Sequence, residues 1–141
     1  MANRTFAIIK PDAIKKCNTG KIYDCILSAD FNIVGAKMLH MTRAQAEGFY
    51  EVHKDKPFYA ELTLFMSSGQ SMVLVLEKEN AVAEWRKTIG ATNPEEAEEG
   101  TIRRLFATSV GENAVHGSDS DENAEKEIGF FFSESELIAN R

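Results

Sequence analysis

The segment at residues 113–120, NAVHGSDS, carries the densest group of chemically competent side chains in this 141-residue chain. It sets an imidazole, two hydroxyls, an amide and a carboxylate around Gly117. In an extended segment the side chains of His116 and Ser118 project to the same side. A neutral imidazole is a nucleophile, and a histidine with an ordinary pKa of about 6.5 is mostly neutral at slightly alkaline pH. By its spacing alone the segment fits two interpretations, a nucleophilic histidine or an ordinary turn that enters a helix at Ser120.

Several familiar site patterns do not occur in the sequence. It contains no glycine-rich phosphate loop of the GxxxxGK[ST] or GxGxxG kind, no HExxH zinc pattern and no GxSxG nucleophile elbow. Cys17 and Cys25 form neither a CxxC pair nor a disulfide framework. The sequence therefore predicts no protein-bound metal, and it assigns any phosphate binding to individual cations.

Composition and charge narrow the class of protein. Apolar residues make up 43% and charged residues 27% of the chain, which predicts one globular domain over residues 1–141. Residues 1–94 carry a net charge of +2 and residues 95–141 a net charge of −8, which disfavours a stable nucleic-acid complex. The longest apolar block, residues 72–76, is too short for a membrane span, and the first residues lack a signal peptide's apolar region. We expect a cytoplasmic protein that is not embedded in a membrane.

The elements that must position the chemistry follow from apolar spacing and capping residues. Thr42 with Gln45 is a capping box, and it predicts a helix that carries Tyr50 and His53. Asn80 and Ser120 are read as the first residues of two further helices, and Pro11 with Asp12 as a turn. The remaining pattern predicts strands at 4–10, 31–41 and 72–77, helices at 19–29, 58–65 and 101–107, and an irregular region at 91–118. The order suggests a mixed α/β sandwich.

Five segments in this order resemble the nucleoside diphosphate kinase family, in its bacterial type, over residues 3–135. They are residues 6–12 (FAIIKPD), 54–58 (KDKPF), 90–94 (GATNP), 100–103 (GTIR) and 113–120 (NAVHGSDS). Each is weak alone, and their combination is specific. The resemblance implies an α+β fold, the ferredoxin-like βαββαβ sandwich, whose four-stranded antiparallel sheet is covered by helices.

The same resemblance implies a catalytic role for His116. It would take the γ-phosphate of a nucleoside triphosphate, typically ATP, and pass it to a diphosphate in a ping-pong cycle. Glu127 and Ser118 would hold the ring, with Tyr50 beside it. Taken alone, Glu127 is also one more acid of an acidic helix.

The resemblance further assigns substrate contacts. The ribose and phosphates would be bound by Lys10, Arg86, Thr92, Arg103 and Asn113, and the base would stack on Phe58 between Val110 and Leu62. Stacking reads no hydrogen-bonding edge, so broad base specificity is expected. Without the resemblance, Phe58 belongs to an apolar stripe with Leu62, and each arginine is an ordinary solvent-facing residue.

Cofactor and partners are also implied by the resemblance. Mg²⁺ is expected to bind mainly through the nucleotide's phosphates, and the chain is expected to form a homo-oligomer, a tetramer or a hexamer. Two rival functions stay open. One is a non-catalytic interaction or ligand-sensing module on the same scaffold, and the other is a phosphohistidine enzyme that acts on a protein or uses a different phosphate donor.

Overall fold

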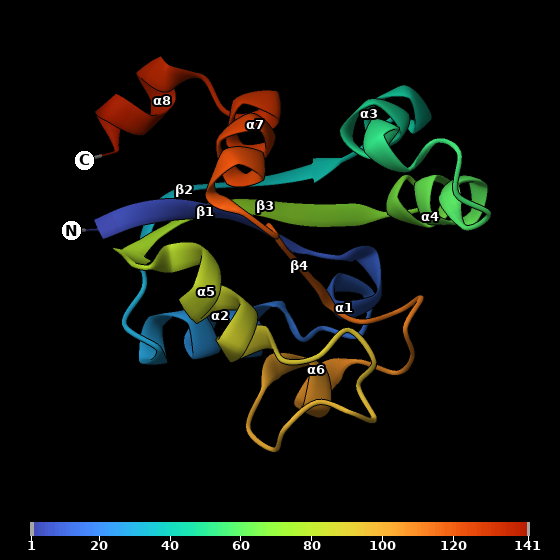
Figure 1. The fold of residues 1–141 in the computed structure, drawn as a ribbon, viewed down its shortest axis with the longest axis horizontal. Helices are drawn as coiled ribbons and strands as arrows, with labels where there is room; N and C mark the ends of the chain where they lie inside the picture. Colours follow the sequence, from blue (N-terminus) through green and yellow to red (C-terminus); the bar gives the residue numbers. More distant parts are fainter. Residues whose placement is uncertain (1, 141) are drawn as a thin grey trace.

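A four-stranded antiparallel sheet forms the centre of the computed structural model, which describes residues 2–140 (Figure 1). The predicted unit at 1–141 extends one residue beyond this range at each end. The strand order is β2-β3-β1-β4, and every pairing is antiparallel. The strands are β1 (Ala2–Ile9), β2 (Asn32–His40), β3 (Gln70–Glu79) and β4 (Val115–Gly117). This confirms the four-stranded antiparallel sheet that the resemblance implied.

Strand β1 is apolar without interruption from Phe6 to Ile9, because both faces of the sheet are covered there. Phe6 and Ile8 belong to one core cluster, whereas Ala7 and Ile9 belong to the cluster on the opposite face. All four side chains are fully buried. Successive side chains of a strand alternate between faces, so a continuous apolar run is what a strand buried on both sides requires.

Helices cover the two faces of the sheet in separate layers (Figure 1). Helices α2 (Thr19–Ser28), α5 (Ala81–Ile89) and α6 (Ile102–Phe106) contribute buried residues to the cluster that contains Ile9. The cluster on the other face includes residues of α3 (Arg43–Phe49), α4 (Tyr59–Met66), α7 (Asp121–Phe131) and α8 (Glu134–Ala139). The remaining elements are α1 (Pro11–Lys15) and the short helix η1 (Glu51–His53).

Two of the three expected helix starts have the predicted capping contact. Thr42 and Gln45 form the complete capping box of α3, and the Ser120 hydroxyl accepts the Asn123 N–H at the start of α7. Asn80 was expected to cap α5 but does not, because it adopts a left-handed conformation with φ of 55°. The Asn3 side chain accepts the Ala81 N–H in its place, at 2.7 Å.

Other differences have local causes. Pro11 begins helix α1 rather than ending the strand in a simple turn, because its fixed φ suits the first helical position. The helix predicted to carry Tyr50 and His53 ends at Phe49; Tyr50 follows as its C-cap, and His53 lies in η1. Strand β4 was not predicted from the pattern. Neither was α8, although Ser133 and Glu136 form its capping box.

Candidate active site

His116 lies in the middle of β4, the shortest strand, opposite Ile8 of β1. This pairing directs its ring toward the sheet face covered by α3 and α7, where a cleft of about 550 Å³ opens. Most of the predicted site residues line this cleft: Lys10, Tyr50, Arg86, Thr92, Arg103, Asn113, His116 and Glu127. The structure thus brings together side chains that lie far apart in the sequence, from Lys10 to Glu127.

The imidazole of His116 is fixed by Glu127, which α7 brings back over β4. His116 Nε2 lies 2.8 Å from Glu127 Oε1, and the Ser118 hydroxyl donates to the same oxygen at 2.7 Å. A carboxylate can only accept, so Nε2 carries the proton. No described residue is hydrogen-bonded to the other ring nitrogen, Nδ1. The lone pair of the neutral ring is therefore on Nδ1, the nitrogen left to react.

Aromatic rings surround the imidazole. Phe49 meets it edge-on with ring centroids 5.5 Å apart, Phe6 at 6.1 Å and Tyr50 at 6.4 Å. Burial in this setting, together with the charges of Lys10 and Arg103, lowers the pKa of His116 even though the hydrogen bond and charge of Glu127 raise it. The ring is consequently neutral, and nucleophilic, at neutral pH.

The main chain at His116 is held by Trp85 of α5. The indole Nε1 donates to the His116 carbonyl at 3.1 Å. A Cβ on Gly117 would stand 2.8 Å from Trp85 Cδ1. Position 117 is therefore restricted to glycine, because the Trp85 indole leaves no space for a Cβ atom. The need for glycine comes from this packing contact rather than from a bound ligand.

Four basic residues line the cleft, Lys10, Arg86, Arg103 and Lys126, and they differ in burial. Lys10 is buried, and its burial, together with the charge of Arg103, lowers its pKa to about 8. Its ammonium group donates to Asn113 Oδ1 at 2.9 Å. Arg103 is also buried, and its pKa falls to about 10 through burial and the charge of Arg86, so it remains cationic at neutral pH. Arg86 is exposed.

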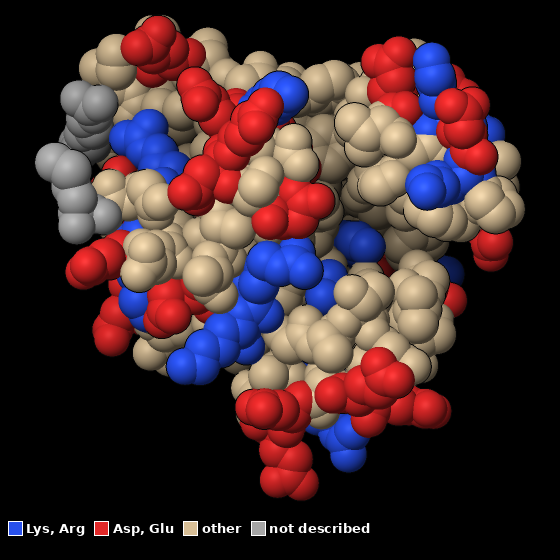
Figure 2. Space-filling view, in the orientation of Figure 1, with Lys and Arg blue, Asp and Glu red and all other residues tan. Residues whose placement is uncertain are grey.

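Arg103 and Asn113 tie the irregular region 91–118 to the site. Arg103 Nη1 donates to the Gly90 carbonyl at 3.0 Å, and Nη2 donates to the Val115 carbonyl at 2.9 Å. Asn113 Nδ2 donates to the Thr92 carbonyl at 3.3 Å. Figure 2 shows Lys and Arg side chains gathered near the centre of this face and in the hollow beside it, with Asp and Glu side chains around much of the periphery. Several basic side chains thus gather at the site, although the protein as a whole is acidic.

The residues expected to hold the base lie outside the lining of this cleft. Phe58 is 47% exposed and Val110 55% exposed, while Leu62 is half-buried on α4. The alternative of Phe58 as a core residue is wrong. Rings lead outward from His116 to Tyr50, then to His53 at 6.5 Å from Tyr50, and then to Phe58 at 5.5 Å from His53.

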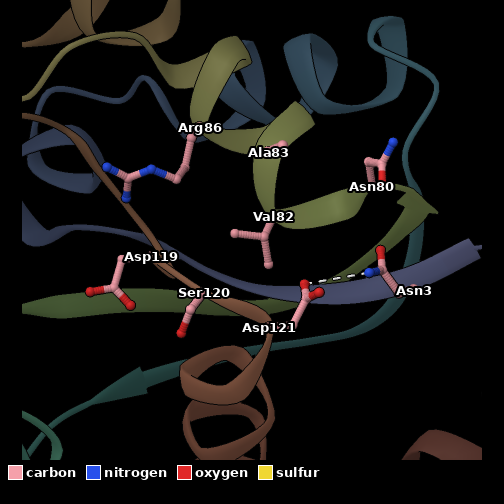
Figure 3. Close-up of a pocket in the computed structure, with 8 residues that line it drawn as sticks. All are labelled: Asn3, Asn80, Val82, Ala83, Arg86, Asp119, Ser120 and Asp121. Carbon is pink, nitrogen blue, oxygen red and sulfur yellow. Dashed lines mark hydrogen bonds between the residues drawn. The ribbon is translucent and has the colours of Figure 1, made fainter.

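A second pocket adjoins the cleft and shares Arg86 and Asp119 with it. Figure 3 shows these two side chains at one end of the pocket, and Asn3 with Asp121 at the other. The Asn3 amide donates to Asp121 Oδ1 at 3.4 Å, which links the start of β1 to the start of α7. A hydrogen bond from Asn123 lowers the pKa of Asp119, so its carboxylate is ionised beside the cleft.

The residues that the sequence pattern missed act on the histidine from outside the motifs. Phe49 and Trp85 are the clearest examples of such residues. Both lie at apolar positions of predicted helices, and the sequence assigned neither of them a role at the site. A partial signal existed for Trp85, because the large side chain of the single tryptophan is expected to be buried.

Among residues 2–140, no group of three or more His, Cys, Asp or Glu side chains has the arrangement of a metal site. No helix in that range has the length and hydropathy to cross a membrane.

Known proteins match both the sequence and the fold. A family model described as nucleoside diphosphate kinase matches residues 3–137. The nucleoside diphosphate kinase of Geotalea uraniireducens is 58% identical over 135 residues, covering 96% of this chain and 98% of its own. That of Salinibacter ruber is 56% identical over 137 residues, covering 97% and 96%.

Solved structures agree with these sequence matches. The Aquifex aeolicus nucleoside diphosphate kinase superposes with a TM-score of 0.94 at 45% identity, covering 96% of this chain and 99% of its own. A halophilic nucleoside diphosphate kinase from Halobacterium salinarum, in complex with CDP, superposes with a TM-score of 0.91 at 33% identity, covering 96% and 91%. The matches of sequence and fold extend over nearly the whole chain, which belongs to the nucleoside diphosphate kinase family.

Proposed function

We propose that the protein transfers the γ-phosphate of a nucleoside triphosphate to a nucleoside diphosphate through a phosphohistidine at His116. One observation carries this assignment. A neutral imidazole, fixed through Nε2 by Glu127, presents Nδ1 in a cleft that also holds Lys10 and Arg103. The roles of the individual residues below belong to the same proposal.

In the first half-reaction, His116 Nδ1 attacks the γ-phosphorus of the triphosphate. The Nδ1–phosphorus bond forms as the bond from phosphorus to the bridging β–γ oxygen breaks, and the diphosphate leaves. The phosphorylated ring gains positive charge, which the Glu127 carboxylate at Nε2 stabilises. Because Nε2 keeps its proton throughout, no proton has to be moved before the attack.

In the second half-reaction, a terminal phosphate oxygen of an acceptor diphosphate attacks the same phosphorus. The nitrogen–phosphorus bond breaks, and the neutral imidazole returns. Negative charge spreads over the phosphoryl oxygens during each transfer, and Arg86, Arg103 and Lys10 line the space that those oxygens would occupy. Thr92 and Asn113 supply further polar contacts on the same side of the cleft.

Apolar side chains that are exposed beyond the cleft could bind the nucleotide base with little selectivity among bases. Phe58 stands at the end of the ring series that begins at His116, with Leu62 on the helix that follows it. Val110 is exposed on the irregular region. Base–aromatic stacking contributes about 1–3 kcal/mol and tolerates any base. We therefore assign nucleoside di- and triphosphates of several bases as substrates.

Magnesium is proposed as the partner of the nucleotide's phosphates. Asp119 is an ionised carboxylate on the cleft wall beside Arg86, and one such group fits an ion that keeps several waters and binds phosphate oxygens. When bound, Mg²⁺ supplies charge neutralisation and alignment of the phosphate chain.

Assembly and location complete the proposal. Strand β2 is a sheet edge of nine residues, and Met38 on it is 46% exposed, which supports pairing with a second copy in a homo-oligomer, a tetramer or a hexamer. We place the reaction in the cytoplasm, since charged nucleotides do not cross membranes unaided. Light scattering coupled to size-exclusion chromatography measures the assembly.

Labelling with ATP carrying a radioactive γ-phosphate tests the function against its rivals. We expect wild-type protein to be labelled and the label to leave on addition of any nucleoside diphosphate, with parallel lines in initial-rate plots. The His116→Asn variant should take up no label. Absence of label on the wild type indicates a non-catalytic module, and release only by some other acceptor indicates a different phosphohistidine enzyme.

A further inference from the structure

Two residues before His116, the main chain adopts an unusual conformation. Ala114 has φ of +71°, in the left-handed region that alanine rarely adopts, and it is completely buried. Glycine would adopt this conformation without steric cost. Ala114 joins Asn113, which contacts Lys10, to the strand that carries His116. Its conformation therefore sets the position of the amide relative to the imidazole.

Both peptide groups of Ala114 are hydrogen-bonded to residues at the junction between β1 and α1. The Ala114 N–H donates to Asp12 Oδ2 at 3.1 Å. The Ala114 carbonyl accepts the Lys10 N–H at 2.8 Å. The Asp12 side chain is only 4% exposed, so its carboxylate faces the protein interior rather than water. A buried acid is costly unless it is paired, and the Ala114 N–H is its partner in segment 113–120.

Asp12 touches neither the cleft nor the imidazole. It is not among the residues that line the cleft around His116, although its neighbour Lys10 is. Its carboxylate attracts the Lys10 ammonium, which in turn donates to Asn113. Two links thus join Asp12 to the site, one through the main chain of Ala114 and one through the charge of Lys10.

We propose that Asp12 is a positioning residue for phosphoryl transfer, whose carboxylate holds Ala114 in its left-handed conformation and thereby sets Asn113 and His116 in register. This inference rests on the proposed function. The alternative is that Asp12 serves only the start of helix α1, since an acid in the first turn is favourable there by itself. The two accounts differ in what a change at Ala114 should do.

Single-turnover labelling of His116 with γ-labelled ATP separates the two accounts. In Asp12→Ala the rate constant should fall by about 10- to 100-fold, since small displacements of reacting groups have effects of this size. The final amount of label per subunit should stay that of the wild type. A purely structural defect would instead lower the final amount, by reducing the folded fraction, and leave the rate constant of the folded fraction unchanged.

A second substitution tests the conformational mechanism directly. We expect the rate loss caused by Asp12→Ala to be at least about fivefold smaller in the Ala114→Gly background, because glycine needs no help to reach a positive φ. Asp12→Asn keeps an oxygen acceptor for the Ala114 N–H, so its labelling rate constant should fall less than that of Asp12→Ala. It also guards against a failure of the alanine variant to fold. Asp24→Ala, at an exposed position of α2, is the matched control and should label like the wild type.

Equal rate losses in the two backgrounds, or a wild-type rate in Asp12→Ala, would overturn the inference. A wild-type protein that takes up no label would instead contradict the proposed function, so the two failures are distinguishable.

Discussion

The Nε2 atom of His116 lies 2.8 Å from Glu127 Oε1, so one of the two ring nitrogens is already occupied. This contact fixes the tautomer and the ring orientation together. Ser118, fully buried beneath it, holds the same carboxylate oxygen.

Replacing Glu127 by glutamine should slow transfer and shift its pH profile. The acid limb of the wild-type kcat profile should lie below the ordinary histidine value of about 6.5, because burial lowers the pKa of His116. Glu127 raises that pKa, so in Glu127→Gln the limb should move to still lower pH. Loss of a charged hydrogen bond should lower kcat by about 10- to 100-fold. A limb that moves upward would refute the assigned contact.

Ser118→Ala removes an uncharged hydroxyl donor, which lies 2.7 Å from Glu127 Oε1 and 3.4 Å from the Phe6 carbonyl oxygen. We expect kcat to fall by about fivefold, the size of one ordinary hydrogen bond, with the KM for ATP unchanged. Steady-state kinetics measures both. A rise in KM without a change in kcat would mean that Ser118 serves binding rather than ring placement.

Arg86 and Arg103 form a matched pair that separates binding from stability. Arg103 donates to two main-chain carbonyls, whereas Arg86 is exposed and makes no hydrogen bond within residues 2–140. Arg103→Met should lower the free energy of unfolding by about 2–4 kcal/mol, and Arg86→Met should change it by less than about 0.5 kcal/mol. Both should weaken ATP binding. Denaturant titrations together with KM values check this, and equal stabilities of the two variants would contradict it.

The affinity for ADP should fall as the pH rises through about 8, the pKa of Lys10 in the free protein. A bound phosphate favours the charged ammonium and raises that pKa, so binding takes up a proton and weakens as the free amine forms. Lys10→Met should bind more weakly at neutral pH and show no such fall. Calorimetry between about pH 7 and pH 9.5 measures the dependence. A pH-independent wild-type affinity would show that Lys10 does not contact the phosphates.

Phe58→Ala should raise KM by about tenfold for purine and pyrimidine diphosphates alike, because stacking is indifferent to the base. The free energy of unfolding of the Phe58→Ala variant should hardly change, since Phe58 is 47% exposed. Phe58→Trp is the control that keeps a stacking surface. A loss confined to one base would indicate that an edge is read by hydrogen bonds elsewhere.

Local signals predicted the local structure well. The Thr42–Gln45 capping box and the Ser120 cap are set by residues within one turn, and both formed as expected. Strand β4 has three residues and exists only through pairing with Ala7–Ile9, more than a hundred residues earlier, so its own sequence could not reveal it. The Asn80 error has the same origin, because the cap is supplied by Asn3 from another strand.

The sequence pointed to residues of the candidate site where they belong to a motif, and less so where tertiary packing places them there. His116 stood out through its polar neighbours, but Glu127 was indistinguishable from other acids of its helix without the family resemblance. Phe49 and Trp85 carry no pattern that points to the imidazole, since their contacts depend on how α3 and α5 pack on the sheet. The left-handed conformation of Ala114 could not be predicted from the sequence either, because alanine does not indicate a positive φ.

Identification of the phosphorylated nitrogen tests the central claim most directly. Protein labelled uniformly with a heavy nitrogen isotope is phosphorylated with ATP, and nitrogen–phosphorus coupling is observed by NMR without acid treatment. The account predicts a single phosphohistidine at His116, bonded through Nδ1, that disappears when a nucleoside diphosphate is added. A phosphate bonded through Nε2, or carried by any other residue, would contradict it.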